Sequence, residues 1–246
     1  MPSGFRDSIV VMPDSLTVPA TFNGPRRSGN GGYAAGALAA FVGEPAEVSL
    51  RSPVPLDTEL QVVGQEDGSV RVLAGETLVC EGRPVGELGL DVPEPVSVGE
   101  ARTASGRYRG LSDGEFCRCF VCGRAREDSF GVFAGEVEGR GLVASPWTPP
   151  GWAEGEDGHV RPELIWAVLD CPTYFASHME GELSAAMLAR MTAEVVAPVA
   201  AGVEHVVIGW PIEIDGRKQH AGSALFSAGG ELLASARALM IEPRGT

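Results

Sequence analysis

The chain has 246 residues, 44% of them hydrophobic, and can bury an ordinary core as one large domain or two smaller ones. Its formal net charge of −14 argues against nucleic acid or an anionic membrane as partner, because both require clustered lysine and arginine. No apolar run approaches the roughly 20 residues that span a bilayer, and the first residues lack a charged-then-apolar signal pattern. We therefore expect a cytoplasmic protein with neither partner.

The first predicted helix covers Gly31–Val42, where small apolar residues follow one another until Gly43 ends the run. Four stretches after it show partial alternation of apolar and polar residues and are separated by turn-forming residues. Such stretches with short connections predict antiparallel strands. We expect these strands at residues 46–54, 59–65, 69–80 and 84–92.

The second half repeats this order after a segment, residues 93–115, that is rich in Gly, Ser, Pro and charge. A strand pair is predicted at residues 130–136 and 139–146, a helix at 162–177, and four strands at 189–199, 205–214, 219–227 and 231–241. A helix followed by four strands thus occurs twice, which predicts two similar units about a pseudo-twofold axis. We place the first unit at residues 1–95, a linker at 96–115 and the second unit at 116–246.

Each predicted helix carries one candidate catalytic element. The first opens with Gly31, Gly32 and Tyr33, whose backbone N–H groups are free of helical partners and can face a developing oxyanion. The second carries Asp170 on an otherwise apolar surface, where desolvation would raise its basicity. The alternatives are tight packing for the glycines and a bond to a neighbouring backbone group for Asp170. Together, the two elements suggest hydrolysis of an acyl ester or thioester.

The motifs occur in an order that resembles the hot-dog acyl-CoA thioesterases. The first half, from Asn30 through the Pro-Val-Pro-Leu segment at 53–56, resembles the N-terminal unit of the double hot-dog enzymes. The second half resembles the phenylacetyl-CoA branch, with Cys-Phe-Val-Cys-Gly at 119–123 and Leu-Asp at 169–170. The resemblance implies an α+β fold of two fused hot-dog units, each an antiparallel sheet wrapped around a central helix. It also implies an acyl-CoA or related thioester substrate and no cofactor, and it leaves a homodimer of such double units open.

Each unit departs from the family pattern in a different half of the site. In the second unit Arg-Pro-Glu at 161–163 replaces the glycine turn, and proline has no N–H to donate. In the first unit the position equivalent to Asp170 is Ala39, which cannot act as a base. Hot-dog sites are implied to form across the interface between units, so we expect one composite site per chain. There the amides of residues 31–33 polarise the carbonyl, while Asp170 either deprotonates water or attacks directly.

Substrate contacts are expected from both halves of the chain. Asn30 lies at the glycine turn, Trp166 and Tyr174 can shape an acyl pocket, and Thr192 can supply a hydroxyl. Arg217 can meet the phosphates of a carrier such as coenzyme A, because phosphate recognition favours Arg and Lys. Further candidates of these kinds are Arg26, Arg27, Lys218 and Ser223.

Two other functions remain as alternatives. Double hot-dog thioesterases usually add a Gln to the acid, and the last predicted strand has none. This absence and the altered second turn favour a non-catalytic acyl-CoA or small-ligand binding protein on the same fold. A hydratase or dehydratase ranks last, because His159 precedes the second helix and does not lie one turn from Asp170.

The cysteines predict reduced thiols and no metal. The total of five is odd, and Cys117, Cys119 and Cys122 are crowded together, unlike the framework of a secreted scaffold. Zinc normally takes four ligands, and the sequence offers neither a second Cys-x2-Cys pair nor histidines at ligand spacing. Cys171 has no histidine near it in sequence and is expected to be a small buried hydrophobe.

Overall fold

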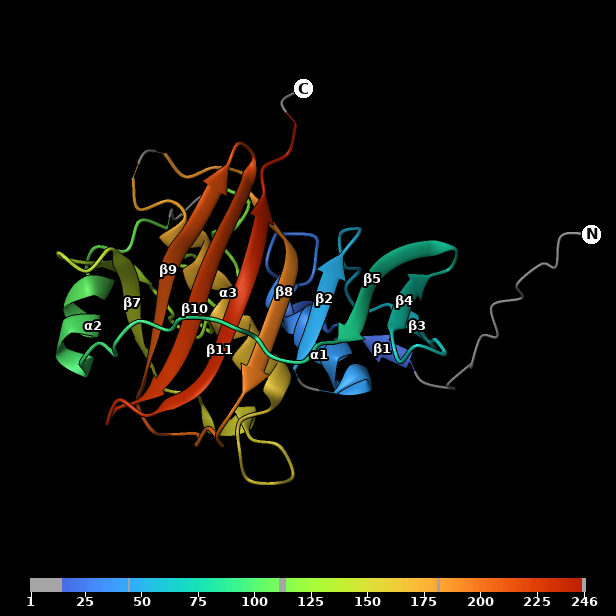
Figure 1. Cartoon of the computed structure of the whole chain (residues 1–246), viewed down its shortest axis with the longest axis horizontal. Helices are drawn as coiled ribbons and strands as arrows, with labels where there is room; N and C mark the ends of the chain where they lie inside the picture. Colours follow the sequence, from blue (N-terminus) through green and yellow to red (C-terminus); the bar gives the residue numbers. More distant parts are fainter. Residues whose placement is uncertain (1–14, 44, 111–113, 181, 245–246) are drawn as a thin grey trace, which may run out of the picture.

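The computed structural model describes residues 15–43, 45–110, 114–180 and 182–244 (Figure 1). Within these ranges eleven strands form one sheet in the order β1-β3-β4-β5-β2-β8-β11-β10-β9-β7-β6, with antiparallel pairing throughout. None of the helices in these ranges is long and apolar enough to cross a membrane. Residues 1–14 of the predicted first unit and 111–113 of the predicted linker lie outside the described residues.

The first half contains one long helix, α1, at the predicted bounds Gly31–Val42. The Asn30 side chain caps it by accepting a hydrogen bond from the Tyr33 amide, and Gly43, at a φ of 89°, ends it. The strands of this half are β1 (Ser15–Thr17), β2 (Ala46–Leu50), β3 (Glu59–Gly64), β4 (Val70–Ala74) and β5 (Thr77–Pro84), and a 3-10 turn, η1, covers Ala20–Phe22.

Two strand predictions in this half were wrong. Residues 69–80 form a hairpin of β4 and β5, because Gly75, at a φ of 60°, turns the chain between them. Residues 85–92 form no strand, and none of their side chains is buried. Leu90 and Val92 are half-buried against a core cluster, so the alternation here marks the packing of an extended segment and not pairing in the sheet.

The second half begins with a helix, α2 (Val98–Ser105), inside the segment predicted as a linker. Ser97 and Glu100 close its first turn with reciprocal hydrogen bonds, the capping box. The remaining elements are β6 (Gly135–Val137), β7 (Leu142–Trp147), the 3-10 turn η2 (Gly151–Ala153), α3 (Pro162–Ala176), β8 (Met187–Val195), β9 (His205–Asp215), β10 (Lys218–Ser227) and β11 (Leu232–Ile241).

The strand predicted at 130–136 begins only at Gly135. Before that point the backbone pairs with the loop that carries the cysteines: the Phe130 amide donates to the Phe120 carbonyl at 2.7 Å, and the Val132 amide donates to the Val121 carbonyl at 3.1 Å. This pairing gives the Phe130 and Val132 amides acceptors away from the sheet.

Both halves of the sheet place the four strands that follow a helix in the same order. That order is β2-β5-β4-β3 in the first half and β8-β11-β10-β9 in the second. The halves join where β2 and β8 pair antiparallel, with Val48 opposite Met191, and Figure 1 shows these two strands side by side. The predicted repeat of a helix and four strands is therefore present in the structure.

The helices α1 and α3 contact each other through glycines of α1. A Cβ at Gly32 would lie 2.6 Å from the Trp166 carbonyl oxygen, and one at Gly36 would lie 2.7 Å from the Cα of Glu163. Backbone atoms cannot move aside as a flexible side chain can. Only glycine lets the two helices approach this closely.

We expect Gly36→Ala to lower the free energy of unfolding by about 1–3 kcal/mol, because the added methyl overpacks the contact with α3. The matched control is Gly99→Ala in α2, where a Cβ would meet nothing within 4 Å. That variant should be more stable by about 0.5–1 kcal/mol, because alanine favours helix. Denaturant unfolding of both variants measures the two changes; a loss of stability that is equal in both would contradict close packing at Gly36.

Candidate functional site

The first turn of α1 meets a carboxylate of α3. The Gly32 amide donates to Asp170 Oδ2 at 3.0 Å, and both groups are buried. The sequence predicts that the N-terminus of α1 faces Asp170, and this contact confirms it. Asp170 therefore also bonds a backbone group, which was the alternative to a catalytic role.

Asp170 lies in a poorly solvated position. Burial raises the pKa of its carboxyl group to about 7, which is the direction predicted from the apolar sequence around it. The hydrogen bond from Gly32 lowers the pKa of Asp170, since it favours the charged form. Negative charge at Cys119 raises this pKa further.

The three amides predicted as oxyanion donors have different partners. The Gly32 amide is bound to Asp170, and the Tyr33 amide donates to Asn30 Oδ1 at 2.9 Å. The Gly31 amide has no acceptor among the described residues, and Gly31 lines a cavity. Gly31 is therefore the donor available to a bound molecule.

The cavity has a volume of about 480 Å³ and lies at the N-terminus of α1. Its wall includes Gly31 from α1 and Asp170 from α3. Apolar side chains from three strands, Leu50, Leu188 and Met240, make up another part. The sequence does not single out these three residues, because an apolar residue that lines a cavity has the same pattern as one in the core.

Of the predicted binding residues, Asn30 and Tyr174 line this cavity. The Tyr174 hydroxyl donates to the Ser184 carbonyl at 2.6 Å, which fixes the ring in place. Trp166 is fully buried and does not line the cavity, because it packs against Gly36. Its position gives it a packing role between the helices.

Thr192 and Arg217 also lie outside the wall of this cavity. Thr192 is flanked on β8 by the buried Met191 and Ala193, so its side chain points to the opposite face of the sheet. Arg217 donates to the Glu242 carbonyl at 2.6 Å near the β9–β10 turn. The structure therefore does not bring these two residues to Asp170.

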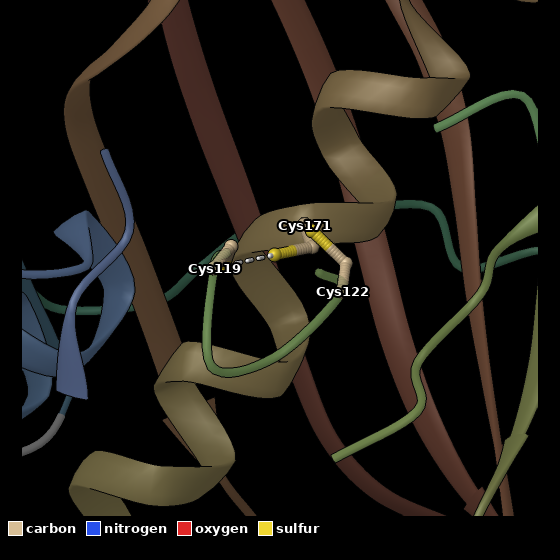
Figure 2. A group of neighbouring side chains, drawn as sticks. All are labelled: Cys119, Cys122 and Cys171. Carbon is tan, nitrogen blue, oxygen red and sulfur yellow. Dashed lines mark hydrogen bonds between the residues drawn. The ribbon is translucent and has the colours of Figure 1, made fainter. Parts of the chain in front are cut away.

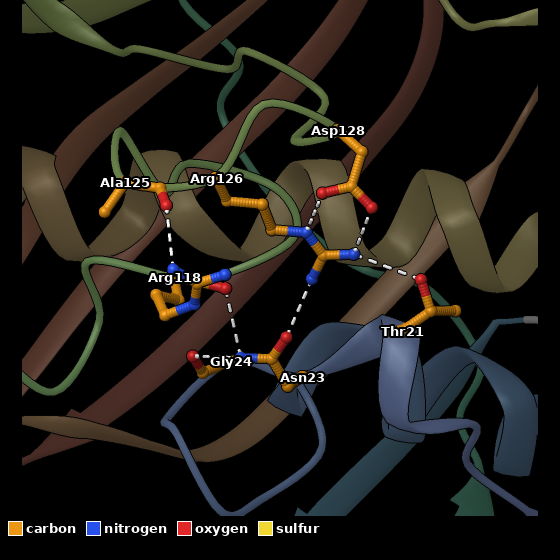
Figure 3. A network of polar contacts seen from close by, with 7 residues as sticks. All are labelled: Thr21, Asn23, Gly24, Arg118, Ala125, Arg126 and Asp128. Carbon is orange, nitrogen blue, oxygen red and sulfur yellow. Dashed lines mark hydrogen bonds and ion pairs between the residues drawn. The ribbon is translucent and has the colours of Figure 1, made fainter.

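A loop of the second half covers the entry to α1 (Figure 3). The Arg126 side chain donates to Asn23 Oδ1 at 2.7 Å and to Thr21 Oγ1 at 3.0 Å, and it pairs with Asp128. The Asn23 side chain in turn donates to the Arg118 carbonyl at 3.1 Å. These bonds hold the loop that carries Cys119 and Cys122 against the segment that leads into α1.

Three buried cysteines meet at the edge of the cavity (Figure 2). Cys119 and Cys122 come from the loop and Cys171 from α3, and their Sγ atoms all lie within 4.8 Å of one another. Hydrogen bonds from the Cys122 and Cys171 thiols hold the pKa of Cys119 well below its usual range, while the pKa values of the two donors rise. The sequence showed only the loop cysteines as a cluster, because Cys171 lies far along the chain.

Comparison with solved structures identifies the fold. No protein-family model and no curated protein sequence matches the chain. Among solved structures, the TesB protein of Mycobacterium avium subspecies paratuberculosis aligns over 93% of this chain and 91% of its own, with 14% identity and a TM-score of 0.61. A candidate thioesterase from Novosphingobium aromaticivorans aligns over 98% and 100%, with 13% identity and a TM-score of 0.62. The chain has the fold of the hot-dog thioesterases.

The TM-scores of 0.61 and 0.62 establish the fold, and identities of 13–14% support nothing beyond the fold. The predicted α+β class agrees with this result, since a large antiparallel sheet carries few helices. What a hot-dog protein does depends on the residues at its site.

Proposed function

We propose that this protein hydrolyses acyl thioesters in the cavity where Asp170 meets the first turn of α1. The observation that carries the proposal is the 3.0 Å hydrogen bond from the Gly32 amide to Asp170, next to the unpaired Gly31 amide. A carboxylate and a free backbone donor then face the same apolar space, as attack on an acyl carbon requires.

We further propose that the fold is a double hot-dog, with one unit at residues 1–95 and the other at 116–246. The identical strand order in the two halves of the sheet supports this division, as does the antiparallel junction of β2 and β8. The site is then composite, because α1 of one unit supplies the amides and α3 of the other supplies the acid.

In the proposed reaction the thioester carbonyl oxygen accepts a hydrogen bond from the Gly31 amide. The Gly32 amide fixes Oδ2 of Asp170, which leaves Oδ1 to act. Oδ1 either deprotonates a water that adds to the carbonyl carbon, or attacks this carbon itself to form an anhydride that water then opens. In both routes the carbon–sulfur bond breaks, and the leaving thiolate takes up a proton. The products are a carboxylic acid and a thiol.

The proposed substrate is an acyl-CoA or a related thioester. The apolar wall fits an acyl group, and Arg27 is an exposed cation on the cavity wall where a carrier phosphate can reach it. Arg26 is less available, since its side chain contacts the Gly114 carbonyl and Cys117.

A non-catalytic acyl-CoA binding protein is the second candidate. The observation that favours it is the apolar character of the wall beside Asp170: β8 contributes Leu188 and β11 contributes Met240. Neither side chain can orient water. Among the described residues, β8 and β11 contribute only apolar side chains to the cavity wall.

A panel of acyl-CoA esters with free-thiol detection distinguishes the two candidates. Hydrolysis of at least one ester, with turnover that depends on Asp170, supports the enzyme. Binding without release of thiol across the panel supports the second candidate.

We expect one acyl-CoA site per chain. The equivalent position in the other half would pair Ala39 with the helix entry at Pro162, which offers neither an acid nor an N–H at N1. Isothermal calorimetry with a non-hydrolysable thioether analogue should therefore give a stoichiometry of one. Two equivalent sites per chain would contradict the composite site.

A further inference from the structure

The sulfur atoms of Cys119, Cys122 and Cys171 are spaced as metal ligands are. A tetrahedral zinc site with Zn–S bonds of about 2.3 Å separates neighbouring sulfurs by about 3.8 Å. Here the Cys119 and Cys171 sulfurs lie 3.9 Å apart, and all three fall within 4.8 Å of one another. The three thiols are therefore close enough together to approach one ion.

The loop is folded so that the Cys119 sulfur faces a hydrogen-bond donor. The Asn30 side-chain nitrogen donates a hydrogen bond to this sulfur at 3.8 Å. The Gly123 amide closes the turn by donating to the Cys119 carbonyl at 2.8 Å. Donors of this kind orient a thiolate ligand and stabilise its charge.

Glycine is required directly after the second cysteine of this turn. A Cβ at Gly123 would lie 2.5 Å from the Cys119 carbonyl oxygen and 2.6 Å from the Cys119 nitrogen. Both are backbone atoms of the same turn. The Cys-Phe-Val-Cys-Gly sequence is therefore built to present two sulfurs from one tight turn, and α3 presents the third.

All three cysteines line the cavity that contains Asp170. A cation held by them would be covered by protein on the side of the loop and of α3. Its fourth coordination position would face the cavity, where water or a small ligand can enter. Three protein ligands with one open position is the arrangement of zinc sites that exchange a ligand.

We propose that Cys119, Cys122 and Cys171 bind one zinc ion, with the fourth coordination position open to the cavity. Three sulfur ligands select a soft or borderline cation over Mg²⁺ or Ca²⁺, which prefer oxygen. The proposal revises the expectation of no metal, which rested on the absence of a fourth ligand from the sequence. It does not depend on thioester hydrolysis, because the ligands and their spacing are the same in an enzyme and in a binding protein.

Cobalt titration of the full-length protein tests the site. The protein is purified under reducing conditions, stripped with a chelator and titrated anaerobically with Co²⁺, which reports thiolate ligation by charge-transfer absorption and four-coordinate geometry by visible bands. We expect both signals to saturate at one Co²⁺ per chain and to vanish when Zn²⁺ is added. Absence of both signals in protein with fully reduced thiols would overturn the proposal, and this measurement needs no variant.

Variants then assign the ligands. Cys119→Ser, Cys122→Ser and Cys171→Ser should each abolish the one-to-one cobalt signal. The matched control is Cys117→Ala, because Cys117 is buried on the same loop but is not one of the three clustered thiols. This variant should keep the wild-type stoichiometry and spectrum; loss of the signal there, or its survival in all three serine variants, would contradict the assignment.

Discussion

Asp170→Asn is expected to lower thioester turnover by at least about 100-fold, which corresponds to about 2.7 kcal/mol of transition-state stabilisation. Asparagine keeps the size of the side chain, and its carbonyl oxygen can still accept the hydrogen bond from the Gly32 amide. It cannot accept a proton or form an anhydride. The change therefore removes the chemistry and leaves the contact between α1 and α3 in place.

The variant should be folded and at least as stable as the wild type, because a buried carboxylate is costly to desolvate. Thermal unfolding checks this, and initial rates on the best ester of the panel measure the loss. The matched control is Glu163→Gln, an acid in the first turn of the same helix that pairs with Arg161 and does not line the cavity. Near-wild-type hydrolysis by a folded Asp170→Asn protein would remove Asp170 from the mechanism.

The sequence was sufficient for the elements whose signals are local. The helix α1 was predicted at its observed bounds, because a run of small apolar residues ends at Gly43, and both signals are local. The cap at Asn30 is seen only in the structure. The meeting of α1 with Asp170 could also be predicted. The resemblance to hot-dog thioesterases implies a site across the interface, and the complementary loss at Ala39 and in the 161–163 turn indicates which halves meet there.

The sequence was not sufficient where contacts between distant parts of the chain determine which residues come together. The clustering of Cys171 with the loop cysteines depends on how α3 packs under the loop, and no spacing rule connects positions 122 and 171. The difference among the amides of residues 31–33 depends on which acceptors lie near each N–H group. In the same way, the position of Thr192 away from the cavity follows from the register of β8, and Arg217 lies in the turn between β9 and β10.

Gly31→Pro is expected to remove the oxyanion donor while leaving α1 intact. Proline is favoured at the first position of a helix, where its missing N–H costs no helical hydrogen bond. Asn30 already has the extended backbone that a residue before proline requires, with φ of −62° and ψ of 135°. The second half of the chain contains this same entry, because Arg161, with φ of −57° and ψ of 134°, precedes Pro162 at the start of α3.

The matched comparison is Gly31→Ala, which adds a Cβ at the same place but keeps the N–H. In both variants the Cβ would crowd the Leu188 and Leu50 side chains, at 2.9 Å and 3.1 Å. The proline variant should then turn over about 100-fold to 1,000-fold more slowly than the alanine variant, which is the usual effect of losing one donor to a developing oxyanion. The loss should appear in kcat, because the donor acts mainly on the charge that develops in the transition state. Equal kcat values for the two variants would show that the Gly31 amide does not stabilise that charge.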